Sequence, residues 1–196
     1  MLQNLINGKR MKPISVTRIN IQPQTHVRST KGDTWLFAVT EEYLMEYDAK
    51  KLIENPDGKR GRNLNRLRQL QRYNAYKQDL RIFAKENKFE MPHGYFAIWF
   101  YVPCPPSWRP KRLKEMLYTV HQSTPDCDNL IKAFLDGIMP RKNKASGEKG
   151  SDDRKVHCYA AFKMWVKPEE ASIKILEYND IDFIKTFEDG LPYYGL

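Results

Sequence analysis

Seven consecutive apolar residues, from Phe96 to Val102, form an uninterrupted run in the chain. It is far shorter than the ~18 apolar residues that a membrane-spanning helix needs, and its length suits a buried strand. Pro92 precedes the run and Pro103 follows it, and proline typically interrupts regular structure. The sequence therefore predicts a central strand over residues 95–102 and no association with a membrane.

Apolar periodicity predicts the other elements of the fold. Alternating apolar and polar residues indicate a strand over residues 14–21, and we expect further strands over residues 34–39, 156–166 and 173–176. Apolar residues at three- and four-residue spacing indicate helices, which we expect over residues 41–51, 64–87, 107–118 and from about 129 to 138. Ser107 is the expected N-cap of the third of these helices.

Charge is the first indication of function. The chain has 196 residues, which corresponds to about one domain, and its 33 lysine and arginine residues against 24 acidic residues give a net charge of +9. Such a basic domain typically has a polyanionic partner, most often a nucleic acid. The three cysteines form no C-x-x-C pair, and no apolar signal segment follows Met1, so we expect reduced thiols and a cytoplasmic protein.

Two segments concentrate the positive charge. Residues 62–88 carry eight lysine and arginine residues against Asp79 and Glu86, which is too one-sided for a helix face laced by salt bridges. A merely solvated face remains the alternative to contact with phosphates. The second segment is a glycine- and lysine-rich loop over residues 139–151. The candidate phosphate-contacting residues are Arg66, Arg72, Lys77 and Arg81 on the helix, Arg141, Lys142, Lys144 and Lys149 in the loop, and Arg154 after it.

A pair of carboxylates begins the last predicted helix. Asp126 and Asp128 are two residues apart, so in an extended segment their side chains point the same way and can share a divalent cation. Asp128 or Asn129 is the expected N-cap, and Lys132 lies one turn further on. The alternative is a doubly acidic cap in which Lys132 pairs with Asp128 or Asp136.

A second acidic pair opens the strand predicted over residues 156–166. Asp152 and Asp153 precede this strand, so the fold can bring a third carboxylate beside Asp126 and Asp128. Carboxylates gathered in a basic protein repel a phosphate backbone unless a bound cation reverses the local charge. The combination indicates metal-assisted phosphodiester chemistry.

The segment from Asp126 to Ile138, followed by Asp152-Asp153 and a strand with Lys163, resembles the RusA family of Holliday-junction resolvases, whose pattern is D-x-D-N-L-x-K-A-x-x-D followed by D-D. The resemblance implies an α+β fold with a small mixed sheet and two main helices, in a homodimer that cuts four-way DNA with Mg²⁺ or Mn²⁺. It assigns catalysis to Asp126, Asp128, Asp153 and Lys132, and the metal to the three aspartates with Asp152 beside them. Extra length at residues 105–124 and 139–150 departs from the family pattern.

This reading divides the chain into a basic arm (residues 1–12), a nuclease domain (13–177) and an acidic, aromatic tail (178–196). It implies paired symmetric nicks in branched DNA during recombination and repair. No glycine-rich phosphate loop is visible, so we expect no nucleotide cofactor. The alternatives are a nucleic-acid-binding protein without catalysis, a metal nuclease of other branched DNA, and an interaction protein that works through the tail.

Overall fold

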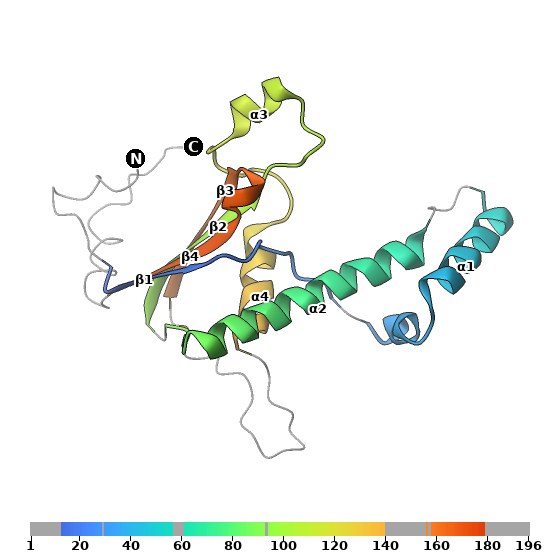
Figure 1. The fold of residues 1–196 in the computed structure, drawn as a ribbon, viewed down its shortest axis with the longest axis horizontal. Helices are drawn as coiled ribbons and strands as arrows, with labels where there is room; N and C mark the ends of the chain where they lie inside the picture. The colour runs from blue at the N-terminus through green and yellow to red at the C-terminus, as the bar shows by residue number, and fades with distance from the viewer. Residues whose placement is uncertain are drawn as a thin grey trace, which may run out of the picture.

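The computed structural model describes residues 13–28, 30–56, 61–92, 94–139, 156 and 158–178. They form a four-stranded mixed sheet in the order β1-β4-β2-β3 (Figure 1). Strand β2 (Tyr95–Pro103) is central and lies parallel to β3 (Cys158–Val166) and antiparallel to β4 (Ser172–Tyr178). Strand β1 (Ser15–Ile19) pairs with β4 at the other edge. The apolar run at residues 96–102 thus forms the interior of the sheet, as its composition predicts.

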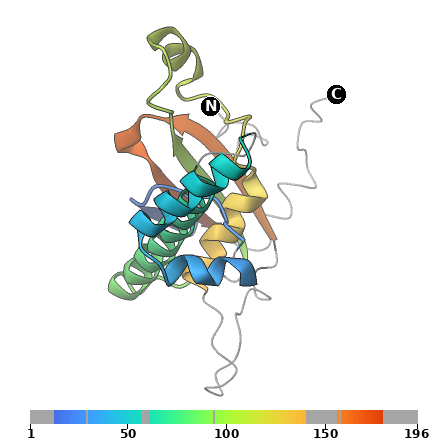
Figure 2. The ribbon, with the colours of Figure 1, turned by 90° about the vertical axis from the view of Figure 1, so that its right-hand side faces the viewer.

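Two helices pack together against this sheet. Helix α2 (Arg62–Glu86) is the long helix that the apolar spacing predicts, and α4 (Cys127–Ile138) follows the aspartate pair. They cross and pack against each other (Figure 1), and they are green and yellow in Figure 2. The predicted α+β fold, with a small mixed sheet and two main helices, is confirmed.

The core lies between these helices and the sheet. Alternate residues of β2 point into it, and the sheet side of α4 contributes Leu130 and Phe134. The rings of Phe100 and Phe134 meet edge to face at 6.5 Å. At Gly137 the two helices come so close that an added Cβ would lie 2.5 Å from the Leu80 Cδ1 atom. The absence of a side chain at this position therefore sets how closely α4 approaches α2.

A smaller lobe lies at the N-terminal end of α2, beyond the edge of the sheet (Figure 1). It consists of α1 (Glu41–Glu54) and the 3₁₀ helix η2 (Lys31–Phe37), which bury a separate cluster of leucines against α2. The strand predicted over residues 34–39 is wrong, because this segment is η2. Thr30 and Asp33 form a capping box, and the Thr34 hydroxyl donates to the Lys31 carbonyl at 2.8 Å. Such local hydrogen bonds stabilise a helical turn where no neighbouring strand offers a ladder.

Helix α3 (Pro110–Met116) is shorter than predicted and does not begin at Ser107. Arg109 has the extended backbone of an N-cap, and Pro110 is the first helical residue, where proline's fixed φ and missing N–H are tolerated. A short 3₁₀ turn, η5 (Pro168–Glu170), joins β3 to β4. Among the described residues, no helix is long and apolar enough to cross a bilayer. The predicted arm (1–12) and residues 179–196 of the tail lie outside the described ranges.

Candidate active site

Helix α4 begins at the aspartate pair. Asp126 is its N-cap, and the Asp126 carbonyl accepts the first helical hydrogen bond, from the Leu130 amide at 3.2 Å. The prediction of Asp128 or Asn129 as the cap is therefore wrong, because the helix starts two residues earlier. Asp128 lies in the first helical turn rather than in an extended segment.

The carboxylates of Asp126 and Asp128 are not used to stabilise the described fold. Both residues are exposed, and the Asp126 side chain makes no capping hydrogen bond. Among the described residues, neither carboxylate accepts a hydrogen bond or joins an ion pair. The alternative of a purely structural acidic cap requires a hydrogen bond from a backbone N–H to the capping carboxylate, and Asp126 does not accept one. Two exposed carboxylates at the positive end of a helix are hard oxygen donors that fit Mg²⁺ or Mn²⁺.

Lys132 lies one turn beyond Asp128 and is also exposed. It forms no ion pair with Asp128 or Asp136. The alternative in which Lys132 only pairs with one of these aspartates along the helix is therefore wrong. Asp136 has other partners, because it accepts a hydrogen bond from the Tyr73 hydroxyl at 2.9 Å and lies 3.6 Å from the Nε2 atom of His26. Lys132 is thus left without an ionic partner among the described residues, one helical turn beyond Asp128.

His26 belongs to this surface although nothing in the sequence marked it. Its backbone N–H donates to the Asn129 carbonyl at 3.1 Å, and its ring meets the Tyr73 ring edge-on at 5.6 Å. Burial lowers the pKa of His26, and the nearby positive charge of Lys132 lowers it further. His26, Tyr73 and Asp136 together attach the segment after β1 and helix α2 to the exposed side of α4.

Lys163 fastens the loop that carries the aspartates to strand β3. Its ammonium group donates to the carbonyl oxygens of Ser123 and Pro125, at 2.6 and 2.7 Å. The His121 amide donates to the Lys163 carbonyl at 3.0 Å, which ties the preceding residues to the same strand. The sequence contains one indication of this contact. Lys163 is a charged residue on a strand face that also carries Tyr159, Ala161 and Trp165 and is turned toward the helices, so its ammonium group needs a polar partner there.

The remaining residues of the predicted site, metal ligands and DNA-contacting residues alike, lie outside the described residues. These are Asp152 and Asp153, which precede β3, and the basic residues Arg141, Lys142, Lys144, Lys149 and Arg154. Within the described ranges, no three histidine, cysteine, aspartate or glutamate side chains gather to form a metal site. The described half of the predicted site is therefore the pair at the start of α4, and the contribution of Asp153 remains a prediction.

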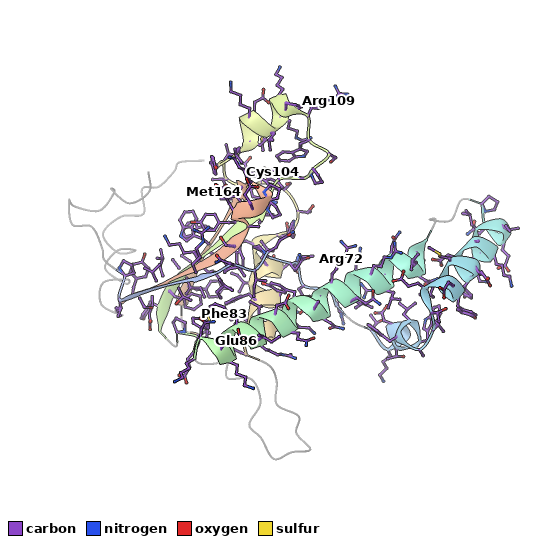
Figure 3. The ribbon with its side chains drawn as sticks, in the orientation of Figure 1. Arg72, Phe83, Glu86, Cys104, Arg109 and Met164 are labelled. Atoms are coloured by element: carbon purple, nitrogen blue, oxygen red, sulfur yellow. The ribbon has the colours of Figure 1, made fainter. Side chains whose placement is uncertain are left out.

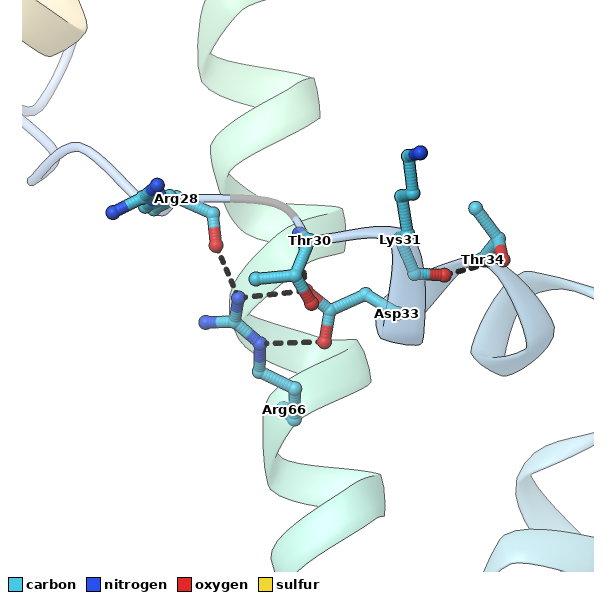
Figure 4. A network of polar contacts seen from close by, with 6 residues as sticks. All are labelled: Arg28, Thr30, Lys31, Asp33, Thr34 and Arg66. Carbon is cyan, nitrogen blue, oxygen red and sulfur yellow. Dashed lines mark hydrogen bonds and ion pairs between the residues drawn. The ribbon is translucent and has the colours of Figure 1, made fainter.

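Arg66 in the predicted basic face of α2 is engaged within the protein. Its guanidinium donates to both carboxylate oxygens of Asp33, at 3.0 and 2.9 Å, and to the Arg28 carbonyl (Figure 4). Arg68 pairs with Glu41 at 2.9 Å. Acidic residues from the small lobe thus pair with two arginines near the N-terminal end of α2, which the count of charges along the helix alone could not reveal.

The middle of α2 keeps its positive charge exposed. Arg72 and Arg81 are exposed and form no ion pair with the described residues, and Arg72 is labelled in Figure 3. The Lys77 ammonium lies over the Tyr73 ring, 4.4 Å from its centroid, and burial lowers the pKa of Lys77. Because Tyr73 also contacts Asp136 of α4, Lys77 borders the surface that carries Lys132.

The α+β fold thus carries two exposed carboxylates at the start of α4 and an exposed lysine without an ion pair one turn further on, among the described residues. The family model described as Endodeoxyribonuclease RusA matches residues 53–176, so the chain belongs to the RusA endodeoxyribonuclease family. Searches of curated proteins and of solved structures gave no significant match.

Proposed function

We propose that this protein is a metal-dependent endodeoxyribonuclease that resolves Holliday junctions by paired, symmetric nicks. The observation that carries the proposal is the exposed, unpartnered state of the Asp126 and Asp128 carboxylates among the described residues, at the start of α4. Membership of the RusA family supplies the class of reaction.

Each residue of the site has a proposed role. Asp126, Asp128 and Asp153 hold Mg²⁺, or Mn²⁺ in its place, with Asp152 beside them. The bound ion supplies Lewis-acid polarisation of a phosphate and lowers the pKa of water. Lys132 offsets the negative charge that develops on the phosphoryl oxygens, which its lack of an ion pair with Asp128 or Asp136 leaves it free to do.

DNA contacts in this proposal come from residues whose charge the fold leaves available. On α2 these are Arg72, Lys77 and Arg81, whereas Arg66 serves the small lobe through Asp33. The segment after α4 adds Arg141, Lys142, Lys144 and Lys149, followed by Arg154. Such contacts bind phosphates without reading bases, so junction affinity is expected to fall steeply with salt. A homodimer would present two sites to two symmetry-related strands of the junction.

The test uses a synthetic four-way junction, end-labelled on each strand in turn, with and without Mg²⁺. We expect paired symmetric nicks that require the metal, and their loss in Asp126→Asn and Asp128→Asn with junction binding retained. Asp79→Asn is the matched control, because Asp79 is an exposed aspartate on α2 away from the aspartate pair. Wild-type cutting by Asp126→Asn would refute the metal site. Binding without nicks in either metal would favour the binding-only alternative, and equal cutting of flaps, duplex and single strands would favour a less selective nuclease.

A further inference from the structure

Helix α3 projects from the end of the sheet, and none of its residues is buried (Figure 1). Four cations lie on it or immediately before it, against the single acid Glu115. Among the described residues none of the four joins an ion pair, in contrast to Arg66 and Arg68 of α2. Figure 3 labels the first of them on the projection, away from the sheet. The four cations are Arg109, Lys111, Arg112 and Lys114.

The projection has a fixed base. The Trp108 ring packs against the buried Trp165 ring at 4.7 Å, and Trp165 stacks on His121 at 3.7 Å. Arg112 lies over the Trp108 ring, 4.6 Å from its centroid. Since these rings hold the start of α3 against β3, the cations are presented on an ordered support rather than on a loose loop.

Backbone hydrogen bonds attach both ends of the projection to the same end of β3. On the outgoing side the Cys104 amide donates to the Val166 carbonyl at 2.9 Å, and on the returning side the Tyr118 amide donates to the Trp165 carbonyl at 2.9 Å. The chain then follows the edge of β3 to Lys163, whose ammonium holds Pro125. The projection and the aspartate pair are therefore carried by one continuous segment that is fastened to one strand.

We infer that α3 binds the phosphate backbone of a junction arm, next to the stretch of DNA that is cut. The inference rests on the proposed function, and it assigns to residues 109–114 a role that the motif residues do not supply. Helices that lie on membranes need a broad apolar face, whereas α3 offers only Leu113 and Met116 among seven residues. Exposed, unpaired cations on a rigid support suit phosphates, which require charge and position rather than an apolar groove.

The test measures binding of a fluorescently labelled four-way junction without divalent metal, so that no cutting occurs, at 50–200 mM NaCl. The variant combines Arg109→Gln, Lys111→Gln and Lys114→Gln, and keeps Arg112 because it packs on Trp108. The control variant combines Lys31→Gln, Lys50→Gln and Lys51→Gln, which removes the same charge from exposed residues of the small lobe. Thermal unfolding of both variants checks the fold, and the double variant Lys111→Gln/Lys114→Gln provides a milder change.

If all three residues contact phosphates, the slope of log K against log salt becomes shallower by up to about 2.7, and by about 1.8 for the double variant. The unsubstituted protein would then lose about 40-fold more affinity than the triple variant across this fourfold range of salt. The control should keep the slope of the unsubstituted protein.

An unchanged slope in the folded triple variant would overturn the inference while leaving the nuclease proposal intact. Binding to anionic vesicles is measured in the same way. If the triple variant loses vesicle binding but keeps the salt slope for the junction, α3 is a membrane-binding element and the inference is overturned. Failure of the unsubstituted protein to bind the junction would overturn both proposals.

Discussion

The ammonium group of Lys163 lies 2.7 Å from the carbonyl oxygen of Pro125, so a side chain of β3 holds the residue immediately before Asp126. A second hydrogen bond from the same ammonium, to the Ser123 carbonyl at 2.6 Å, fixes the loop at two points. The strand that provides Lys163 is also the strand that follows Asp152 and Asp153 in the sequence. Lys163 thus links the two segments from which the proposed metal ligands come.

We expect Lys163→Met to weaken metal binding, because it keeps the aliphatic stem and removes both loop hydrogen bonds. Groups that orient metal ligands are worth about 10- to 100-fold in metal affinity or activity. Calorimetric titration with Mn²⁺ measures the affinity directly, and the Mn²⁺ concentration for half-maximal junction cutting should rise in parallel. Lys163→Arg, which retains donors, should restore part of the loss.

The control for this experiment is Lys167→Met, since Lys167 is exposed just beyond the end of β3. It should bind Mn²⁺ like the unsubstituted protein. Equal Mn²⁺ affinity in Lys163→Met and the control would show that the hydrogen bonds to Ser123 and Pro125 do not position the aspartates.

Arg66 and Arg72 belong to the same helix, and their substitution should have opposite consequences. Arg66→Gln removes two charge-assisted hydrogen bonds to Asp33 and should lower the free energy of unfolding by about 1.5–3 kcal/mol. Arg72→Gln should change stability by less than about 0.5 kcal/mol, because Arg72 is exposed and forms no ion pair with the described residues.

For junction binding the order of the two effects is reversed, so that Arg72→Gln has the larger effect. Arg72→Gln should reduce the salt slope by about 0.9, which is the effect of one lost phosphate contact. Arg66→Gln should leave the slope unchanged at a temperature where the variant is folded. A reduced slope for Arg66→Gln would show that its guanidinium reaches DNA in spite of Asp33.

Local patterns in the sequence predicted the central elements of the fold. The apolar run at residues 96–102 and the regular spacing of Leu67, Leu70 and Leu80 indicate β2 and α2, because burial of these side chains is itself the cause of each element. The strand predicted over 34–39 is wrong because a short apolar run such as residues 35–39 is compatible with a strand or a helix. The structure of this segment follows instead from Thr30, Asp33 and the distant Arg66.

The site shows the same division between local and distant causes. The D-x-D spacing and the lysine one turn later are local, and they were visible in the sequence. The contacts of His26 with Asn129 and Asp136, and those of Lys163 with Pro125, join residues far apart in the chain. Long-range hydrogen bonds leave no periodicity in a sequence, so no local pattern could have predicted them.

Asp33 should make stability depend on pH. The hydrogen bonds from Arg66 hold the pKa of this carboxyl well below its usual range, with a further contribution from the Thr30 amide. A lowered folded-state pKa stabilises the fold above the unfolded-state value of about 3.9, and this stabilisation is lost as the pH falls through the folded-state pKa. Asp33→Asn should therefore be less stable than the unsubstituted protein at pH 6–7, and the difference should shrink below about pH 4.

Urea unfolding from pH 3 to pH 7 measures this difference. Asp79→Asn, at an exposed aspartate, should show a small and nearly constant difference over the same range. A gap between Asp33→Asn and the unsubstituted protein that stays constant down to pH 3 would contradict the assignment of this pH dependence to Asp33.

Gly137→Ala should destabilise the contact between α4 and α2. An added Cβ would lie 2.5 Å from the Leu80 Cδ1 atom and 3.2 Å from its Cβ, so the Leu80 side chain must move and the helices must separate slightly. Overpacking of this kind costs about 1–3 kcal/mol, which exceeds the gain of up to about 1 kcal/mol in helix propensity. Thermal and urea unfolding should show the loss. Because Leu80→Ala is itself destabilising, the cost of Gly137→Ala is compared in the two backgrounds, and it should be smaller in Leu80→Ala, where the Leu80 methyl groups are absent. Wild-type stability in Gly137→Ala would mean that the helices do not meet as closely as the 2.5 Å approach requires.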